Sequence, residues 1–223
     1  MAKDAATSFP GAGATQADPL TFALAPLGDA LTDARARWAS LLLLDTLGVY
    51  IAAMPMEAGR IARDVAPRLY AANDARDQAS LPLDGRRCSR AGAAFAMATQ
   101  IDNLDAHDGY NPTKGHIGCA AVPALLAEAE GRELSGRDAL AALIVAYEVA
   151  GRAGIALHAT VSDYHTSGAW NGLGVAALGA RMRRLAPEQL RHAFGIAEYH
   201  GPRSQMMREI AHPTMLHDGS GMG

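Results

Sequence analysis

The densest group of reactive side chains lies between Asp102 and His116, and Lys114 is among them. Asp105 and Asp108 are three positions apart, so they share a face if the preceding helix continues that far. Carboxylates at this spacing, close to imidazole and lysine cations, are typical of a tuned acid and base site. A solvated helix end followed by a polar loop has the same composition. The position of this polar segment between two apolar helices favours an acid and base site over a solvated helix end.

A second polar segment, from Asp163 to Gly168, separates two apolar helical stretches. Thr166 or Ser167 is expected to cap the helix that follows, so that the first-turn amides of that helix point toward this segment. His165 at such a helix start is able to exchange a proton with an anionic ligand. The alternative interpretation is a pair of ordinary caps beside a surface histidine.

The third segment is the glycine-rich end of the chain, from His212 to Gly223, with Arg203 and Arg208 shortly before it. Its composition fits a disordered terminus. The apolar pair at 215–216 favours a packed segment instead.

Three other kinds of site receive little support from the sequence. Possible metal ligands are present, but no HExxH or paired CxxC motif arranges them, so we expect no bound metal and no cofactor. A Ser-His-Asp hydrolase would need a GxSxG turn, which is missing. The glycines of a possible nucleotide loop follow no strand, and close helix packing explains them better. The possible metal ligands are Asp105, His107, Asp108, His116 and His165, and the glycines are Gly168, Gly172, Gly174 and Gly179.

The composition favours a folded, mostly α-helical protein. Of 223 residues, 49% are hydrophobic and 19% charged, and 48 are alanine, the best helix former. The formal net charge of -3 gives little support to nucleic-acid binding. The twenty basic residues include only two lysines, Lys3 and Lys114, so a reaction that needs a lysine side chain must use one of these two. Cys88 and Cys119 are expected to be reduced, partly buried thiols.

No targeting or membrane-spanning segment is expected. Residues 1–19 are small and polar, with no apolar core of a signal peptide. The most apolar stretch, Leu41–Met56, is interrupted by Asp45 and Pro55 well short of the ~20 residues that a span needs. The expected location is therefore the cytoplasm.

The hydrophobic periodicity predicts an all-α, multi-helix bundle of about seven or eight helices. Residues 1–19 are expected to form a flexible arm and residues 20–223 the helical domain. Arg60, Arg63 and Asp64 are expected to face water, and residues 73–90 to form a loop with a short extended piece. The helices are expected at Leu20–Leu27, Ala34–Ala53, Ala58–Ala72, Ala91–Asn103, Ala120–Glu130, Gly136–Ala159, Gly168–Leu185 and Glu188–Tyr199.

Taken together, these segments resemble the MmgE/PrpD family, which includes 2-methylcitrate dehydratase, cis-aconitate decarboxylase and iminodisuccinate epimerase. The resemblance covers about residues 20–223 and rests on four stretches in order. They are Ala91–Asp108, Gly115-His116 continuing to Glu130, Tyr147–Arg152, and Tyr164–Gly168. It implies a large helical domain whose α+β lid domain is absent from this chain, because family members are about twice as long. Half of the usual site is then expected to be missing.

The resemblance also implies roles for individual residues. Asp105, Asp108, His116 and His165 match the catalytic positions that surround a small di- or tricarboxylate and move protons. Lys114, Tyr164, Arg203 and His217 are the candidates that bind its carboxylates. Many members carry a lysine close to positions 214–217, where this chain has none, so His217 or Lys114 is expected to replace it.

The leading hypothesis is a cofactor-independent lyase or isomerase that abstracts a proton beside a carboxylate, leading to dehydration, decarboxylation or epimerisation. Such a reaction needs a positioned base and cations that hold the developing negative charge. The alternative is a truncated, non-catalytic helical module that binds or dimerises. Family members commonly form homodimers, and helix 168–185 is the expected contact surface with a twin subunit.

Overall fold

The computed structural model describes residues 18–162, 165–202 and 221–223. Within these ranges the protein is almost entirely helical, as the composition predicts, with one short β-hairpin. The helices are α1 (Pro19–Leu24), α2 (Asp33–Ala52), α3 (Glu57–Leu69), α4 (Arg90–Leu104), α5 (Gly118–Ala129), α6 (Gly136–Thr160), α7 (Gly168–Met182) and α8 (Pro187–His200). The hairpin pairs β1 (Gln78–Ser80) with β2 (Arg87–Ser89) in antiparallel register.

Local sequence signals set most helix starts. Thr32, Ser89 and Ser135 each accept a hydrogen bond from the backbone N–H three residues further on, and so cap α2, α4 and α6. Pro19 occupies the first turn of α1 behind the capping carboxylate of Asp18, so this helix begins at Pro19 rather than at the predicted Leu20.

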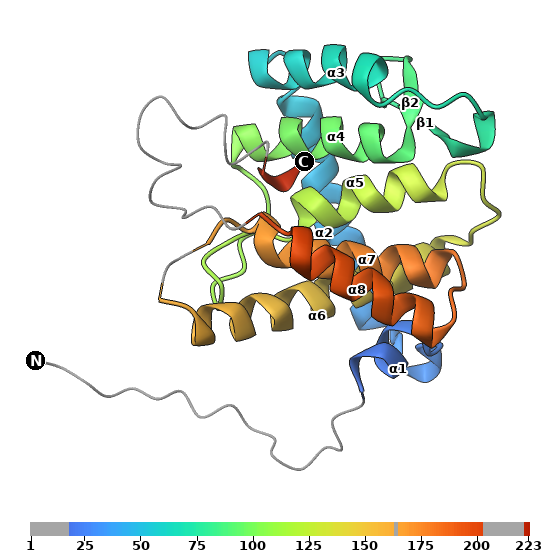
Figure 1. The fold of residues 1–223 in the computed structure, drawn as a ribbon, viewed down its shortest axis with the longest axis vertical. Coiled ribbons are helices and arrows are strands. Elements are labelled where there is room, and N and C mark those ends of the chain that lie inside the picture. The colour runs from blue at the N-terminus through green and yellow to red at the C-terminus, as the bar shows by residue number, and fades with distance from the viewer. Residues whose placement is uncertain (1–17, 163–164, 203–220) are drawn as a thin grey trace, which may run out of the picture.

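Five helices form a stack that places the site at one end of the molecule. In the order of the stack they are α3, α4, α5, α7 and α6, and α2 crosses behind them (Figure 1). Helix α8 covers α7, and α1 packs against both. The loops that follow α4 and α6 meet at the same end of the stack (Figure 1). Segments distant in sequence are thereby brought together.

Helix α7 lies at the centre of the fold. Trp170 and Leu178 are almost completely buried, and the helix packs against α5, α6 and α8 of the same chain. Every residue of α7 is buried or half-buried within the chain, and the contact of helix 168–185 with a twin subunit stays a prediction. A Cβ on Gly174 would lie 2.6 Å from a carbonyl oxygen of α6, which confirms close packing at that glycine. At Gly179 nothing lies within 4 Å, and close packing does not explain it.

The polar segment before α4 is a loop with short extended pieces, as predicted, and it covers a side chain of α3 that was expected to face water. Residues 73–90 contain the hairpin, and the turn between its strands carries Asp84 over α3. Arg63 of α3, expected to face water, is only 7% exposed. Its guanidinium donates to the Gln100 side chain and the Met54 carbonyl and lies 3.5 Å from Asp84. Amphipathic spacing identified the helix, but the hairpin turn that covers this arginine comes from distant residues.

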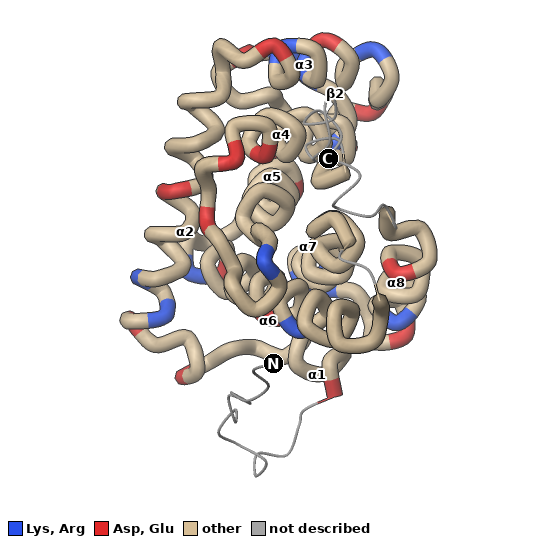
Figure 2. Tube along the Cα trace, turned by 90° about the vertical axis from the view of Figure 1, so that its left-hand side faces the viewer, with Lys and Arg blue, Asp and Glu red and all other residues tan. Residues whose placement is uncertain are grey.

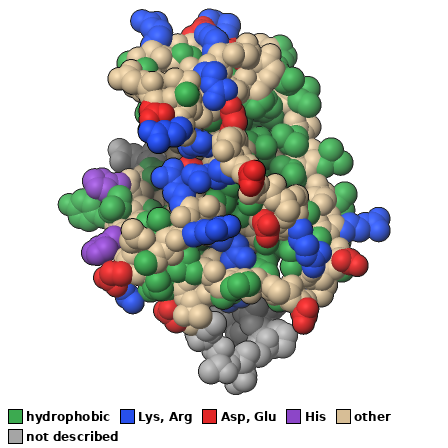
Figure 3. Space-filling model, turned by 90° about the vertical axis from the view of Figure 1, so that its right-hand side faces the viewer, with side chains coloured by type: hydrophobic (Ala, Val, Ile, Leu, Met, Phe, Trp, Pro, Cys, Tyr) green, Lys and Arg blue, Asp and Glu red, His purple; other side chains and the backbone are tan. Residues whose placement is uncertain are grey.

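Charged side chains outside the site are largely interleaved. Basic side chains gather across one face of the molecule, with acidic side chains beside them (Figure 3). Glu128 pairs with Arg132 and Arg183, and Glu130 pairs with Arg87. Burial raises the pKa of both glutamates, but Arg183 and Arg132 hold the pKa of Glu128 below its usual value. Hydrogen bonds from Ser80, together with Arg87, do the same for Glu130.

Cys88 and Cys119 are both buried and do not form a disulfide, as expected. One described helix, α6, is long and apolar enough to cross a membrane by length and composition, which the sequence analysis did not anticipate. A core helix of a soluble protein meets the same criterion, and α6 packs along α7 and α5.

Candidate active site

The candidate site lies where α4 ends, α5 and α7 begin and α6 ends. Asp105 terminates α4 in a left-handed conformation, with φ of 52°, and the chain then turns through residues 106–117 before entering α5. Lys114 in this loop also has a positive φ, of 51°. Backbone conformations of this kind are costly for residues other than glycine and collect at functional sites. The loop is therefore held in shape by its surroundings.

His116 is the centre of a first group of side chains. Its Nδ1 lies 2.7 Å from the Asp108 carbonyl oxygen. Because a carbonyl oxygen only accepts, Nδ1 carries a proton, and Nε2 is the nitrogen that faces Asp105 at 3.1 Å. Asp105 is half exposed, while the His116 side chain is 26% exposed. The group is therefore open to solvent on the Asp105 side.

Asp108 lies deeper in the protein than Asp105, next to the first residue of α5. Its carboxylate accepts a hydrogen bond of 3.0 Å from the Gly118 N–H, and burial raises the pKa of this carboxyl. The side chains of Thr46 and Tyr147 lie beside it, and all three would collide with a Cβ on Gly118. Burial likewise raises the pKa of Tyr147, so its hydroxyl stays neutral. Glycine at position 118 is what allows these polar groups to converge.

His107 adds a buried imidazole behind His116. The two ring centroids are 4.2 Å apart. The His107 side chain is completely covered, and its Nε2 lies 3.5 Å from an Asp102 oxygen that is itself buried. One ligand atom each from Asp105, His107 and His116 lies within 4.8 Å of the others. His107 is among the possible metal ligands in the sequence but is not one of the predicted site residues.

The other loop contributes a second, basic group. His165 is partly buried, and its charge and that of Lys114 both act on His158 near the end of α6. Burial lowers the pKa of His158; a backbone hydrogen bond with His165 opposes this effect, and the two charges add to it. His158 is absent from the sequence-predicted site, although a histidine on the apolar helix α6 is a signal that could have found it.

Two side chains from the start of α7 connect the two loops by hydrogen bonds. The Ser167 hydroxyl accepts from the His116 N–H at 3.4 Å, and the Asn171 side-chain amide donates to the His116 carbonyl at 2.7 Å. Ser167 stands at the cap position of α7 but makes no side-chain capping bond, so of the two predicted caps the one by Ser167 is wrong. A Cβ on Gly115 would collide with this hydroxyl. Neither Ser167 nor Asn171 was predicted to position the site.

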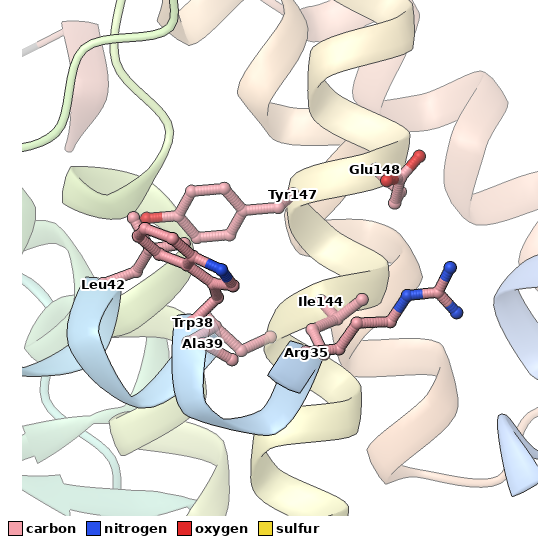
Figure 4. Close-up of a pocket in the computed structure, with 8 residues that line it drawn as sticks. Arg35, Trp38, Ala39, Leu42, Ile144, Tyr147 and Glu148 are labelled. Atoms are coloured by element: carbon pink, nitrogen blue, oxygen red, sulfur yellow. The ribbon is translucent and has the colours of Figure 1, made fainter. Parts of the chain in front are cut away.

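A small pocket of about 210 Å³ lies between α2 and α6, next to the site. Trp38 and Leu42 come from α2, and Tyr147 and Ile144 from α6 (Figure 4). Its mostly apolar wall contains the Tyr147 ring, whose hydroxyl reaches the Asp108 region. The pocket therefore touches the site through one side chain.

Of the eight residues that the sequence selects, the structure brings Asp105, Asp108 and His116 into one group and places Lys114 and His165 around His158. The remaining three, Tyr164, Arg203 and His217, lie outside the described residues. The same holds for most of the glycine-rich third segment. Only its end is described, and there Met222 receives a weak hydrogen bond of 3.6 Å from the Asn171 amide.

The helices stack into an all-helical domain, which is the fold that the sequence predicts. Two loops of this domain bring carboxylate and imidazole groups together. The MmgE/PrpD N-terminal domain matches residues 22–220, and the chain belongs to this family. No curated protein matched the chain.

Proposed function

We propose that this protein is a lyase or isomerase of the MmgE/PrpD type that abstracts a proton from a small di- or tricarboxylate in the cytoplasm. Dehydration and epimerisation remove a carbon-bound proton beside a carboxylate, and decarboxylation releases CO2 and then adds a proton, so all three develop negative charge that nearby groups must stabilise. The observation that carries the proposal is the fastening of the His116 loop to the start of α7 by Ser167 and Asn171. This contact places acid and base groups from two distant segments at one end of the domain.

His165 is the group best suited to transfer the proton. Both ring nitrogens of His116 face protein oxygens, at 2.7 Å and 3.1 Å, so His116 is less available as a base. We assign His116 and Asp105 to orienting and binding the substrate, and Asp108 to holding the loop against α5. Tyr164 is retained as a substrate-binding candidate beside His165.

The site also has features that favour an anionic substrate. Helices α5 and α7 both begin there, and helix starts carry partial positive charge. Lys114 is exposed on the loop between α4 and α5 and is a suitable carboxylate partner. Arg203 and His217 complete the proposed set of cations. No cofactor is needed for proton abstraction supported in this way.

Proton NMR in heavy water tests the proposal directly. The purified chain is incubated with methylcitrate, citrate, cis-aconitate and short hydroxy-dicarboxylates. Loss of an α-proton signal, or a new vinyl signal, is the expected result. His165→Ala is expected to slow that reaction by about 10²–10⁴-fold, the usual contribution of a general acid or base. His192→Ala is the matched control, because this histidine is 75% exposed on α8.

Two outcomes would refute the proposal. A folded chain that leaves every carboxylate unchanged would favour the non-catalytic binding module. Turnover that is equal in His165→Ala and the control would remove His165 from the reaction.

We also propose that the protein forms a homodimer through α2 rather than α7. Helix α2 runs along one edge of the molecule (Figure 2) and exposes large apolar side chains. Trp38 is 68% exposed and Leu44 66%, with Leu41 and Ile51 also exposed. Apolar faces of this size on a single helix are typical of contact surfaces. A Trp38→Glu variant is expected to be monomeric by light scattering, and an unchanged dimer would contradict this assignment.

A further inference from the structure

The turn that carries Lys114, residues 110–115, has a closed hydrogen-bond pattern and is called the lysine turn below. Tyr110 and Gly115 pair at its base, where the Tyr110 N–H donates to the Gly115 carbonyl at 2.7 Å. The N–H and the hydroxyl of Thr113 both donate to the Tyr110 carbonyl. Thr113 is 1% exposed, whereas the next residue, Lys114, is exposed. The lysine turn therefore buries one side chain and presents Lys114 to solvent.

Two glycines of α6, Gly151 and Gly154, form a notch that receives the lysine turn. They are three positions apart, so they lie on one face of the helix. A Cβ on Gly151 would lie 3.1–3.3 Å from atoms of the Tyr110 side chain. A Cβ on Gly154 would lie 2.6 Å from the methyl carbon of Thr113. The two glycines therefore set how closely the lysine turn approaches α6, and a larger side chain at either position would displace it.

The backbone of Lys114 is a second sign that its position is fixed. Its φ of 51° is left-handed, a conformation that is costly for residues other than glycine. In this conformation the Lys114 N–H donates to the Asn111 carbonyl at 3.2 Å. Strained conformations persist where the surrounding structure over-determines them, and they collect at ligand-binding sites. The contacts of the lysine turn with the notch supply that constraint.

Three basic side chains gather beyond the notch. His158 is one helical turn after Gly154 on α6. Burial lowers the pKa of His158, and the charges of His165 and Lys114 lower it further, against the effect of a backbone hydrogen bond with His165. Like charges brought together repel, and an anion bound among them relieves that repulsion. The cluster therefore favours an anionic ligand at the place where the lysine turn presents Lys114.

We propose that Lys114 determines the specificity of the site by binding the second carboxylate of the substrate, the one remote from the carbon that loses its proton. Gly151 and Gly154 are positioning residues, because they admit the lysine turn against α6. A lysine ammonium carries three donors on a flexible stem and suits a carboxylate that remains partly in solvent. The site is then selective for dicarboxylates over monocarboxylates of the same length. The nature of the substrate rests on the proposed function, but this selectivity is measured by binding alone.

Two matched probes test the selectivity by calorimetric titration of the full chain. Malate and 2-hydroxybutyrate have the same length, and 2-hydroxybutyrate carries a methyl group in place of the second carboxylate. The unaltered chain is expected to bind malate at least about 10-fold more tightly, the usual effect of a hydrogen bond between charged groups. Lys114→Gln is expected to abolish this preference and to leave the affinity for 2-hydroxybutyrate unchanged.

Carbon-13 NMR locates the contact. The chain has only two lysines, Lys3 and Lys114, so methylation of its amines with carbon-13 gives few signals. The signal that is missing from Lys114→Gln belongs to Lys114. Malate is expected to shift that signal until the site is saturated, whereas 2-hydroxybutyrate is expected to leave it in place.

Gly151→Ala tests the notch. This variant is expected to lose most of the malate preference and to keep its affinity for 2-hydroxybutyrate, because it displaces the lysine turn and not the rest of the site. Gly136→Ala is the matched control on α6, since no atom lies within 4 Å of its Cβ, and it is expected to keep the full preference.

The proposal would be overturned by any of three results. They are an unaltered chain without a malate preference, a full preference in Lys114→Gln or Gly151→Ala, and a Lys114 signal that malate does not move. A malate preference that depends on Lys114, in a chain that turns over no carboxylate, would refute only the proposed lyase function.

Discussion

Asn171 provides the sharpest test of how the site is positioned. Its side chain is 2% exposed, and its amide donates a hydrogen bond of 2.7 Å to the His116 carbonyl. Asn171→Asp keeps the shape but removes the donor and sets a carboxylate against the carbonyl oxygen. Asn171→Ala removes both the donor and the volume. If the hydrogen bond matters more than the packing, both variants lose stability.

The expected loss follows from the unpaired carbonyl. A buried acceptor left without a partner costs about 1–3 kcal/mol. For a chain of this size, about 2 kcal/mol lowers the Tm by roughly 4–8 °C. The Asn171→Asp loss is expected to grow between pH 5 and pH 7, because burial raises the pKa of the new carboxyl and only its protonated form can donate. Thermal unfolding at both pH values measures this.

Asn103 offers a matched control. Its side-chain amide donates to the Thr99 carbonyl at 3.2 Å inside α4, in a partly buried position. Asn103→Asp is expected to change stability by only about 0.5 kcal/mol and to leave the His116 imidazole NMR signals in place. The Asn171 variants are expected to move those signals. An Asn171→Asp protein with unaltered Tm and unaltered His116 signals would refute the reasoning.

Three further predictions concern packing and burial. Gly174→Ala places a Cβ 2.6 Å from a carbonyl oxygen of α6 and is expected to lower the free energy of unfolding by about 1–3 kcal/mol. Gly179→Ala meets no atom within 4 Å and is expected to raise the free energy of unfolding by about 0.5–1 kcal/mol. The midpoints of urea unfolding compare the two variants. Gly115→Ala would collide with the Ser167 hydroxyl and is expected to disturb the His116 NMR signals, and adding Ser167→Ala should restore them in part. Burial raises the pKa of Tyr50 from 10.0 to about 12, so the folded state favours the neutral hydroxyl. Its contribution to stability is present below pH 10 and lost as the pH rises through about 12, a loss that pH-dependent unfolding of Tyr50→Phe should lack.

The sequence determined the elements because their signals are local. Thr32, Ser89 and Ser135 cap helices with their own hydroxyls, and alanine-rich periodicity fixes the helices between them. The same local composition marked the loop from Asp105 to His116 as chemically unusual. The resemblance that rested on these segments agrees with the family to which the chain belongs.

Only the tertiary structure decided which side chains are covered and which meet. Arg63 is buried because a distant hairpin turn folds over it, and His107 is buried because the loop turns inward behind His116. Asn171 reaches the His116 carbonyl across 55 residues of sequence. Burial and hydrogen bonding depend on neighbours supplied by other elements, and no periodicity within one segment specifies them. The sequence therefore determined the helices and the polar loops, and the packing of α4 to α7 determined the site.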